Sequence, residues 1–546
     1  MPVTQLLRGR VLPLARGLDT ASSVLLQGED IVGVDSSAGD GAAVSDFGDR
    51  TIMPGFIDAH AHAQSSAIGA ASMLDCVNTC SSIEEMQQVL LDQMDVARDT
   101  GWLHARGLFQ LNVRWSDGRY PTREDLDRIT TKYPVALRTG HISVLSTKAM
   151  EVLELHRFFD VKHGSGGPVT IQRGDDGQPN GRITNLDGLL AYPEADEATM
   201  RRTIAERLHL DYTARGTTTV CEISDARLPL DILTELLEDG TLASRFKMLF
   251  RVPRIMSFDD ALHWRDSGIR EIPGLLEMIG VKLFADGGMS SGDAALEVPY
   301  LDHVALEPGS RGVLSYDDAE LADLIRKTRD AGLQLALHSL GERCQEQVCR
   351  VTESLGVDPD LPVRLEHGAD WVWNPDTPSR WKRAGAVPVP NPAFIYLMAS
   401  TMPGLLGDYA RRPGRLPFRS LMEAGWDLPA GSDATCYYDS NVSDPIFSMW
   451  ATMKRESWDG SIVEPDEALS LEQALRMHTV NGAKALGEGD RKGTLEAGKL
   501  ADLLVLDRDI TDGVDADNIR DVKIDFVYVG GRQVFARDGA QAPLPA

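Results

Sequence analysis

The sequence predicts an α/β protein built on a (β/α)8 TIM barrel, with a small β-sandwich formed by both chain termini and a long insertion after the first barrel strand. Three observations lead to this prediction. Apolar runs alternate with helical stretches through the middle of the chain, which is typical of parallel strands and crossover helices. Both chain ends contain only short strand-like segments broken by Gly and Asp. Residues 59–216 separate the first two barrel strands, far more than one crossover helix needs.

Eight apolar segments are the candidate barrel strands, and eight is the number that a closed barrel needs. Helical patterns lie between them, for example at 317–331 and 341–355. In chain order the candidate strands are Thr51–Asp58, Thr217–Glu222, Lys247–Val252, Gly280–Phe284, Gln334–His338, Val363–His367, Ala386–Pro390 and Leu428–Asp433.

The pattern divides the chain into two domains. We expect residues 1–52 and 490–546 to form the β-sandwich domain, and residues 53–489 to form the barrel domain. Within the barrel domain, residues 75–215 are the insertion, which includes a hairpin-like stretch rich in Gly and Pro at 166–177. Because long loops that fold on themselves are usually functional, we expect this insertion to cover the barrel mouth.

The composition is that of an ordinary soluble protein with a strongly acidic balance. The 546 residues carry a formal net charge of −27, which argues against a nucleic-acid or anionic-membrane partner. The six Cys have no metal-finger spacing, and the first ten residues lack a signal-like pattern. No apolar run is long enough for a transmembrane helix. A reduced, cytoplasmic setting is the simplest interpretation.

Residues able to bind a metal lie at or near the ends of several candidate strands. Since the carboxyl ends of barrel strands meet at one rim, we expect these side chains to converge. His60 and His62 are two residues apart and share a face of their strand, so both can bind one ion. The full set is His60, His62, Lys282, His338, His367 and Asp433.

Neutral imidazoles with a carboxylate suit Zn²⁺ or another divalent first-row metal. The ion would lower the pKa of a bound water from about 15.7 to about 7. Asp433 would accept the proton of this water and pass it to the leaving group. One His-x-His pair is a weak signal, but the ordered set over five strands predicts a metal-dependent hydrolase.

The segment Met53–His62 resembles the first-strand signature of the amidohydrolase superfamily, and Gly493–Leu506 resembles its C-terminal signature. The interior is similar to amidohydrolase family 3, the YtcJ-like branch, at Gly140–Ser146, Gly177–Arg182, Val281–Gly287, His338–Arg343, Arg364–His367 and Gly431–Asp433. The resemblance implies that His60, His62 and Asp433 bind the more buried ion. It also implies that Lys282 stands where the superfamily often has an N6-carboxylysine bridging to a second ion, here on His338 and His367, although some relatives use one ion. The alternative for Lys282 is a substrate-binding or structural ammonium.

Several loops depart from the family pattern and concern the substrate pocket. The Arg that often follows the strand-four Lys is absent from Asp286–Gly292, and no Arg clamp is evident, which favours a neutral or apolar substrate. His141, in the insertion, is a candidate to stabilise the oxyanion of the transition state. The candidate substrate-binding residues are Trp115, Met289, Tyr437 and Tyr438. A structural role is the alternative for His141, and a buried core position is the alternative for Trp115. We interpret the histidines off the strand ends, such as His104 and His478, as surface or structural residues.

These observations predict hydrolysis of an amide-like C–N bond in a small molecule. Ester or lactone hydrolysis, deamination or isomerisation at the same metal site are the alternatives, and a non-catalytic ligand-binding protein is a third. The expected partner is a small-molecule substrate, with no nucleic acid and no membrane; a homodimer stays open.

Overall fold

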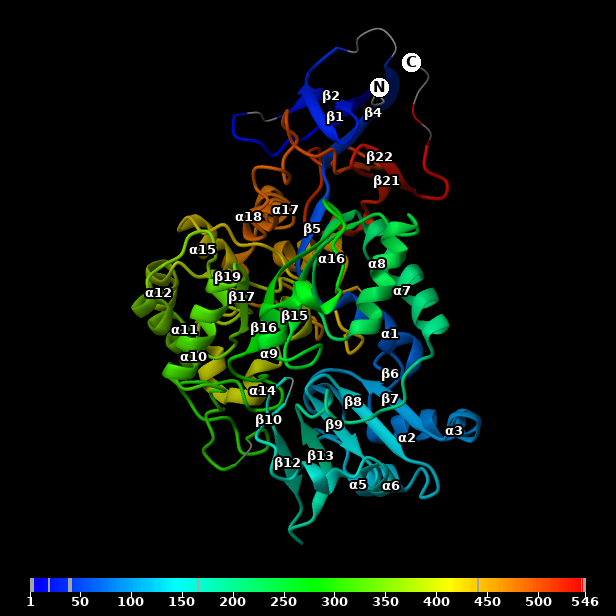
Figure 1. Ribbon diagram of the computed structural model, residues 1–546, viewed down its shortest axis with the longest axis vertical. Helices are drawn as coiled ribbons and strands as arrows, with labels where there is room; N and C mark the ends of the chain where they lie inside the picture. Colours follow the sequence, from blue (N-terminus) through cyan, green and yellow to red (C-terminus); the bar gives the residue numbers. More distant parts are fainter. Residues whose placement is uncertain are drawn as a thin grey trace.

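The computed structural model describes residues 4–17, 20–37, 42–164, 166–305, 307–438, 441–541 and 543. It has three parts along its longest axis (Figure 1): the sheet of the two chain ends, the barrel, and the sheet of the insertion at the far end. The first three residues of the segment that lacks a signal-like pattern lie outside the described part.

The barrel is a parallel sheet of seven strands in the order β19-β18-β17-β16-β15-β14-β5. Every residue of β5 and β14 is buried, because helices and loops keep both faces of this sheet from water. The strands are β5 (Phe56–Ala61), β14 (Thr217–Ser224), β15 (Arg245–Arg251), β16 (Leu276–Phe284), β17 (Gln334–His338), β18 (Arg364–Glu366) and β19 (Val387–Val389).

The segment expected as the eighth strand, Leu428–Asp433, does not form a regular strand. It nevertheless lies between β5 and the end of β19, since Ala430 accepts from the Ala59 amide at 2.8 Å and the Gly431 amide donates to Pro390 at 2.9 Å. Pro429 has no amide hydrogen for a ladder, and Asp433 has a left-handed backbone with φ 50°. The ring is therefore closed by single hydrogen bonds rather than by a paired strand.

The first expected strand, Thr51–Asp58, is divided between two sheets. Residues up to Pro54 belong to β4 (Ala43–Pro54) of the terminal sheet, and the barrel strand starts at Phe56. The break falls at Gly55, where a Cβ atom would lie 2.2 Å from Oγ1 of Thr218. Glycine is needed here because the chain crosses from one sheet to the other in close contact with β14.

The two chain ends form one continuous seven-stranded sheet rather than two separate layers. The sheet curls, because the hairpin between β2 and β3 reaches the residues before β20: the Ile31 amide donates to Lys499 at 2.8 Å. With β4, its strands are β1 (Thr4–Val11), β2 (Ala21–Gln27), β3 (Asp30–Val34), β20 (Leu503–Leu506), β21 (Ile524–Val529) and β22 (Arg532–Ala536).

The insertion has a six-stranded sheet of its own in the order β12-β13-β9-β8-β7-β6. Its β8 (Val135–Thr139) and β9 (Ile142–Leu145) are antiparallel, and the turn between them reaches the barrel. The hairpin is formed by β12 (Thr170–Arg173) and β13 (Pro179–Thr184), so it extends beyond residue 177. The other strands are β6 (Leu74–Cys76) and β7 (Leu103–Gly107).

Buried ion pairs connect the barrel to the C-terminal part of the chain. Arg245, at the start of β15, pairs with Asp502 at 2.8 Å. Glu488 accepts from both Lys247 and Lys492 at 2.7 Å. Because these groups are almost fully removed from water, each pair depends on both partners being charged.

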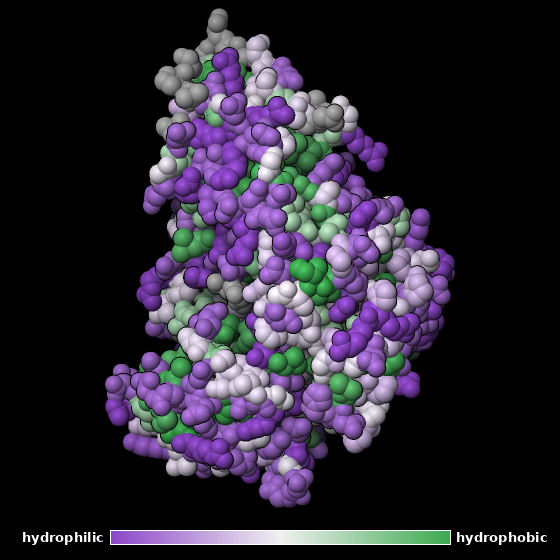
Figure 2. Space-filling view, turned by 180° about the vertical axis from the view of Figure 1, so that it is seen from behind, coloured by the Kyte–Doolittle hydropathy of each residue, from purple (hydrophilic) through white to green (hydrophobic). Residues whose placement is uncertain are grey.

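The molecular surface is mostly hydrophilic on the face that Figure 2 shows. On the face shown in Figure 2, hydrophobic residues form separate small groups among hydrophilic ones. None of the described helices combines the length and apolar character that a membrane crossing requires. All six cysteines lie in the described part and are buried free thiols.

Candidate active site

Three potential ligands converge at the carboxyl end of β5. His60 lies within this strand, and His62 follows it directly. Asp433 approaches from the segment that closes the barrel, with its Oδ1 3.1 Å from Nε2 of His60 and 3.6 Å from Nε2 of His62. One ligand atom from each residue lies within 4.8 Å of the others, and all three residues are buried.

Glu366, which the sequence analysis gave no role, fixes the orientation of His60. It accepts from Nδ1 of His60 and from Nε of Arg364, the latter at 2.7 Å, and the three side chains are 0 % exposed. Burial raises the pKa of Glu366, but the charges of Arg364 and His60 hold it below its usual range. Nε2 of His60 is hydrogen-bonded to Asp433 here; because Nδ1 donates to Glu366, Nε2 is the nitrogen whose lone pair would become available to a metal ion in place of that hydrogen bond.

The sequence of β18 contains a signal that could have marked Glu366 as a site residue. Two charged residues two positions apart, Arg364 and Glu366, share one face of a strand that is otherwise apolar. Charged groups in such a strand require a partner, but the sequence does not say which one.

A second group of side chains adjoins the first one. The ring centroids of His338 and His367 are 4.7 Å apart, and those of His60 and His367 are 5.2 Å apart. Nε2 of His338 donates to the Gly287 carbonyl at 3.1 Å, which leaves Nδ1 as the free donor atom. Nδ1 of His367 bonds to Oδ1 of Asn391 at 2.6 Å, which leaves Nε2 free.

Burial lowers the pKa of the basic groups here, except that Glu366 and Asp433 bring the pKa of His60 above its usual range. It lowers the pKa of His62 and His367 to about 3, and that of Lys282 to about 8. Lys282 lies on β16, with its Nζ 4.7 Å from the Phe284 ring centroid. Unprotonated nitrogens beside an ionised carboxylate are the donor set that Zn²⁺ and similar ions prefer, so these residues fit a divalent metal.

Asp433 makes contacts through both of its carboxylate oxygens. Its Oδ1 faces the two histidines, while its Oδ2 accepts from the Tyr438 hydroxyl at 3.1 Å. Burial raises the pKa of Asp433, but the hydrogen bond from His60 and the nearby imidazoles bring it below the usual range. The carboxylate is thus ionised and held in place from both sides.

His141 comes from the turn between β8 and β9 and lies beside the metal-ligand candidates. Its ring centroid is 5.8 Å from that of His338. Asn185 accepts from Nδ1 of His141 at 2.7 Å and donates through Nδ2 to Asp293 at 2.8 Å. The preceding residue must be glycine, because Gly140 has φ 77° and a Cβ atom there would lie 2.0 Å from the Phe109 ring.

A cavity of about 300 Å³ opens onto these residues, a volume suited to a small molecule. Of the expected substrate-binding residues, Met289, Tyr437 and Tyr438 line it. Trp115 does not line it: this side chain is 3 % exposed and packs in the hydrophobic core of the insertion, which was the alternative position for it. His104 also differs from expectation: it lines the cavity, stacked on Tyr192 with 5.1 Å between ring centroids.

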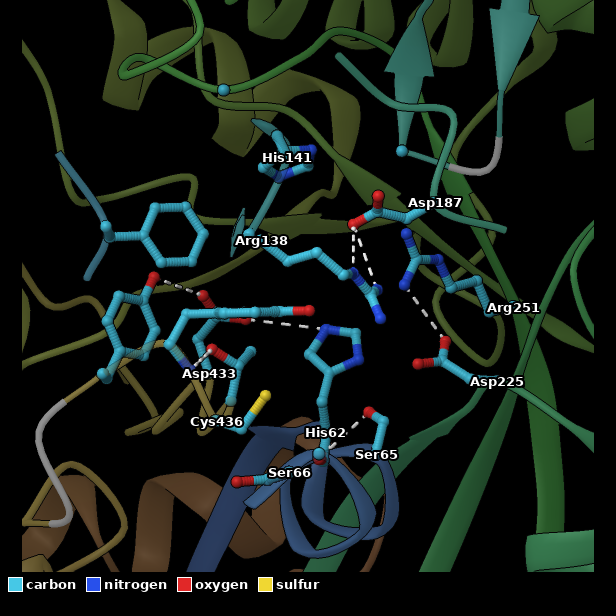
Figure 3. Close-up of a pocket in the computed structure, with 18 of the residues that line it drawn as sticks. His62, Ser65, Ser66, Arg138, His141, Asp187, Asp225, Arg251, Asp433 and Cys436 are labelled. Carbon is cyan, nitrogen blue, oxygen red and sulfur yellow. Dashed lines mark hydrogen bonds and ion pairs between the residues drawn. The ribbon is translucent and has the colours of Figure 1, made fainter. Parts of the chain in front are cut away.

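The cavity wall is more charged than the sequence indicated. Figure 3 shows Arg138 paired with Asp187 and Arg251 paired with Asp225, near His62. Arg254 lines the same cavity. No Arg clamp was evident in the sequence, but three arginines line this cavity in the structure. The sequence did contain a signal for this charged wall. Asp225 follows β14 and Arg251 ends β15, and the carboxyl ends of barrel strands carry the site residues.

Comparisons with known proteins agree with this geometry. The model of the amidohydrolase family matches residues 43–535. The chain is 27 % identical to the N-substituted formamide deformylase of Arthrobacter pascens, over 95 % of this chain and 96 % of that protein. It is 22 % identical to the amidohydrolase YtcJ of Bacillus subtilis (strain 168), over 89 % of each chain. An uncharacterized metal-dependent hydrolase from Pyrococcus horikoshii OT3 has a similar fold, with a TM-score of 0.66, 22 % identity, and coverage of 94 % of this chain and 99 % of that one.

Proposed function

This chain belongs to the amidohydrolase family, and from this premise we propose that it hydrolyses an amide-like C–N bond of a small molecule at a divalent metal centre. The observation that carries the proposal is the convergence of His60, His62 and Asp433 beside a cavity of small-molecule size. As a family member it is a metal-dependent hydrolase acting on carbon–nitrogen bonds.

We expect His60, His62 and Asp433 to hold the first ion, with Zn²⁺ as the metal to test first. His338 and His367 would hold a second ion, bridged to the first by Lys282 as an N6-carboxylysine. The low pKa of Lys282, which burial brings to about 8, supports this role, because the unprotonated amine is the form that reacts with CO₂. A bound ion would supply a water of lowered pKa and polarise the substrate carbonyl.

The protein's own residues would then move the protons. Asp433 would accept the proton of the attacking water and donate it to the leaving nitrogen, while Tyr438 keeps its carboxylate oriented. His141 would donate from Nε2 to the oxygen that gains charge; because Nδ1 already donates to Asn185, this requires the imidazolium form, in which both ring nitrogens carry a proton. Met289, Tyr437 and Tyr438 would form the substrate wall.

The similarity to an N-substituted formamide deformylase supports C–N bond cleavage and suggests the first substrates to test. The protein is assayed on N-substituted formamides, other amides, esters and lactones, after chelation and again after addition of Zn²⁺. We expect amide hydrolysis that disappears with the metal and returns with it. Asp433→Asn should reduce kcat at least roughly 100-fold, with metal content measured alongside. Amide hydrolysis that persists in metal-free protein, or a panel in which only esters and lactones react, would refute the proposal.

A further inference from the structure

One part of the cavity wall is basic, although the whole chain is strongly acidic. Three arginines and two aspartates meet there: Arg138, Arg251, Arg254, Asp187 and Asp225. Arg138 comes from β8 of the insertion, while Arg251 and Arg254 come from the end of β15 and the loop after it. The insertion and the barrel therefore build this wall together.

Two of the three arginines are balanced by carboxylates. Nη2 of Arg138 lies 3.1 Å from Asp187, and Ser143 donates to the other oxygen of Asp187 at 2.5 Å. Nη1 of Arg251 lies 3.1 Å from Asp225. These four charged side chains are 10–14 % exposed, so both pairs are largely removed from water.

Arg254 is the unbalanced charge. It is half-buried, and it makes no hydrogen bond or ion pair with any residue that the structure describes. Burial raises the pKa of Asp187 and Asp225, but the neighbouring arginines, Arg254 among them, keep both below their usual range. The other two carboxylates that line the cavity do not pair with Arg254. Glu194 is exposed to solvent, and Asp433 is hydrogen-bonded to His60 and Tyr438.

The basic wall adjoins the metal-ligand candidates. His62, Asp225, Arg251 and Arg254 line the same cavity, and Figure 3 shows Asp225 and Arg251 beside His62. An anionic group bound at Arg254 and a bond cleaved near His62 can therefore belong to one molecule. Apolar and aromatic side chains such as Phe284 and Leu228 line the same cavity and suit an uncharged spacer.

We infer that the cavity binds substrates that carry a carboxylate on the side of the molecule away from the cleaved C–N bond, with Arg254 as the group that recognises it. A guanidinium matches a carboxylate in shape, and one uncompensated positive charge matches one negative charge. This inference rests on the proposed function, and it replaces the neutral substrate that the sequence favoured.

The test compares a neutral formamide with its charged counterpart, N-benzylformamide and 4-(formamidomethyl)benzoate, in the zinc-loaded enzyme. We expect kcat/KM to be higher for the carboxylate. Arg254→Gln should lower the charged-to-neutral ratio of kcat/KM roughly ten- to hundredfold, the loss expected for one charge-assisted hydrogen bond. Arg254→Lys should retain part of the preference.

Arg326→Gln is the matched control, because Arg326 is exposed on α10 (Asp318–Asp330) and does not line the cavity. It should leave the ratio unchanged. An unchanged ratio in Arg254→Gln, or an equal drop in Arg326→Gln, would overturn the inference.

A binding measurement separates this inference from the proposed function. Calorimetry with 4-methylbenzoate and 4-methylbenzamide reports on the anion site even if neither formamide is hydrolysed. We expect the benzoate to bind more tightly than the benzamide, and Arg254→Gln to remove that difference. If hydrolysis fails but this pattern holds, the proposed reaction is wrong and the anion site stands. If hydrolysis succeeds but the pattern is absent, the anion site is wrong.

Discussion

Replacing Glu366 by glutamine should weaken metal binding and the fold together. In the native protein one oxygen of Glu366 accepts from Nε of Arg364 at 2.7 Å, and the other accepts from Nη2 at 3.2 Å and from Nδ1 of His60. Glutamine keeps the shape but removes the charge and one acceptor. If its NH₂ group faces His60, Nδ1 must become the acceptor and the proton moves to Nε2, where the lone pair for the metal is lost.

The magnitude follows from the burial of this group. Arg364 and Glu366 are fully removed from water, and breaking a buried pair by removing one charge costs about 3–5 kcal/mol. Glutamine still offers Arg364 one oxygen, so we expect a loss near the lower limit, about 3 kcal/mol in the free energy of unfolding. Loss of the partner that orients a metal-binding histidine lowers metal affinity roughly 10- to 100-fold.

Two measurements check this prediction: urea denaturation of the metal-free protein and zinc titration against a competing chelator. Glu342→Gln is the control, because Glu342 is also a buried carboxylate but accepts from the Tyr409 hydroxyl at 2.5 Å, away from the histidines. The control should bind zinc as the wild type does. Wild-type zinc affinity and stability in Glu366→Gln would refute the reasoning.

Three further predictions concern packing, positioning and pH. Gly431→Ala puts a Cβ atom 2.7 Å from that of His60, so we expect lower zinc content and a loss of about 1–3 kcal/mol in stability; full zinc content would contradict this. Asn185→Leu removes the acceptor of Nδ1 of His141, and kcat should fall about tenfold with little change in KM; a change in KM alone would argue for a binding role. Burial raises the pKa of Glu488, but two lysines bring it to about 2, below the usual 4.5, so its stabilisation is complete above pH 4.5 and is lost as the pH falls toward 2. Urea denaturation should show Glu488→Gln destabilised by about 1–3 kcal/mol at pH 7 and less at pH 3, whereas an equal difference at both pH values would contradict the pairing.

Much of the barrel could be predicted because parallel strands buried on both faces are continuous apolar runs. The expected segment Gln334–His338 matches β17 as the structure has it. The eighth segment was not a strand, since a proline and a left-handed residue interrupt the ladder there. The terminal strands were recognisable, but their arrangement in one curled sheet depends on contacts between residues about 470 positions apart, such as Ile31 with Lys499.

The metal-ligand candidates were predictable for a geometric reason. Strand ends meet at one rim of a barrel, so His60, His62 and Asp433 had to approach one another once the strands were assigned. The position of Trp115 stayed open because an aromatic residue in an insertion fits a core as well as a cavity wall. Whether Trp115 packs in the core or lines the cavity depends on which side of the insertion's sheet faces the barrel.

The sequence by itself determined the family, most of the barrel strands and the residue types that can bind a metal, because these follow from local patterns and short motifs. Only the tertiary structure decided the partners of those residues. Glu366 orients His60 across 306 positions of the chain, and His141 reaches the site from the insertion. Arg254 makes no direct hydrogen bond or ion pair with a described residue, and its charge acts on Asp187 and Asp225. Charge balance in a cavity is a property of groups brought together from different elements, so no single segment of the sequence contains it.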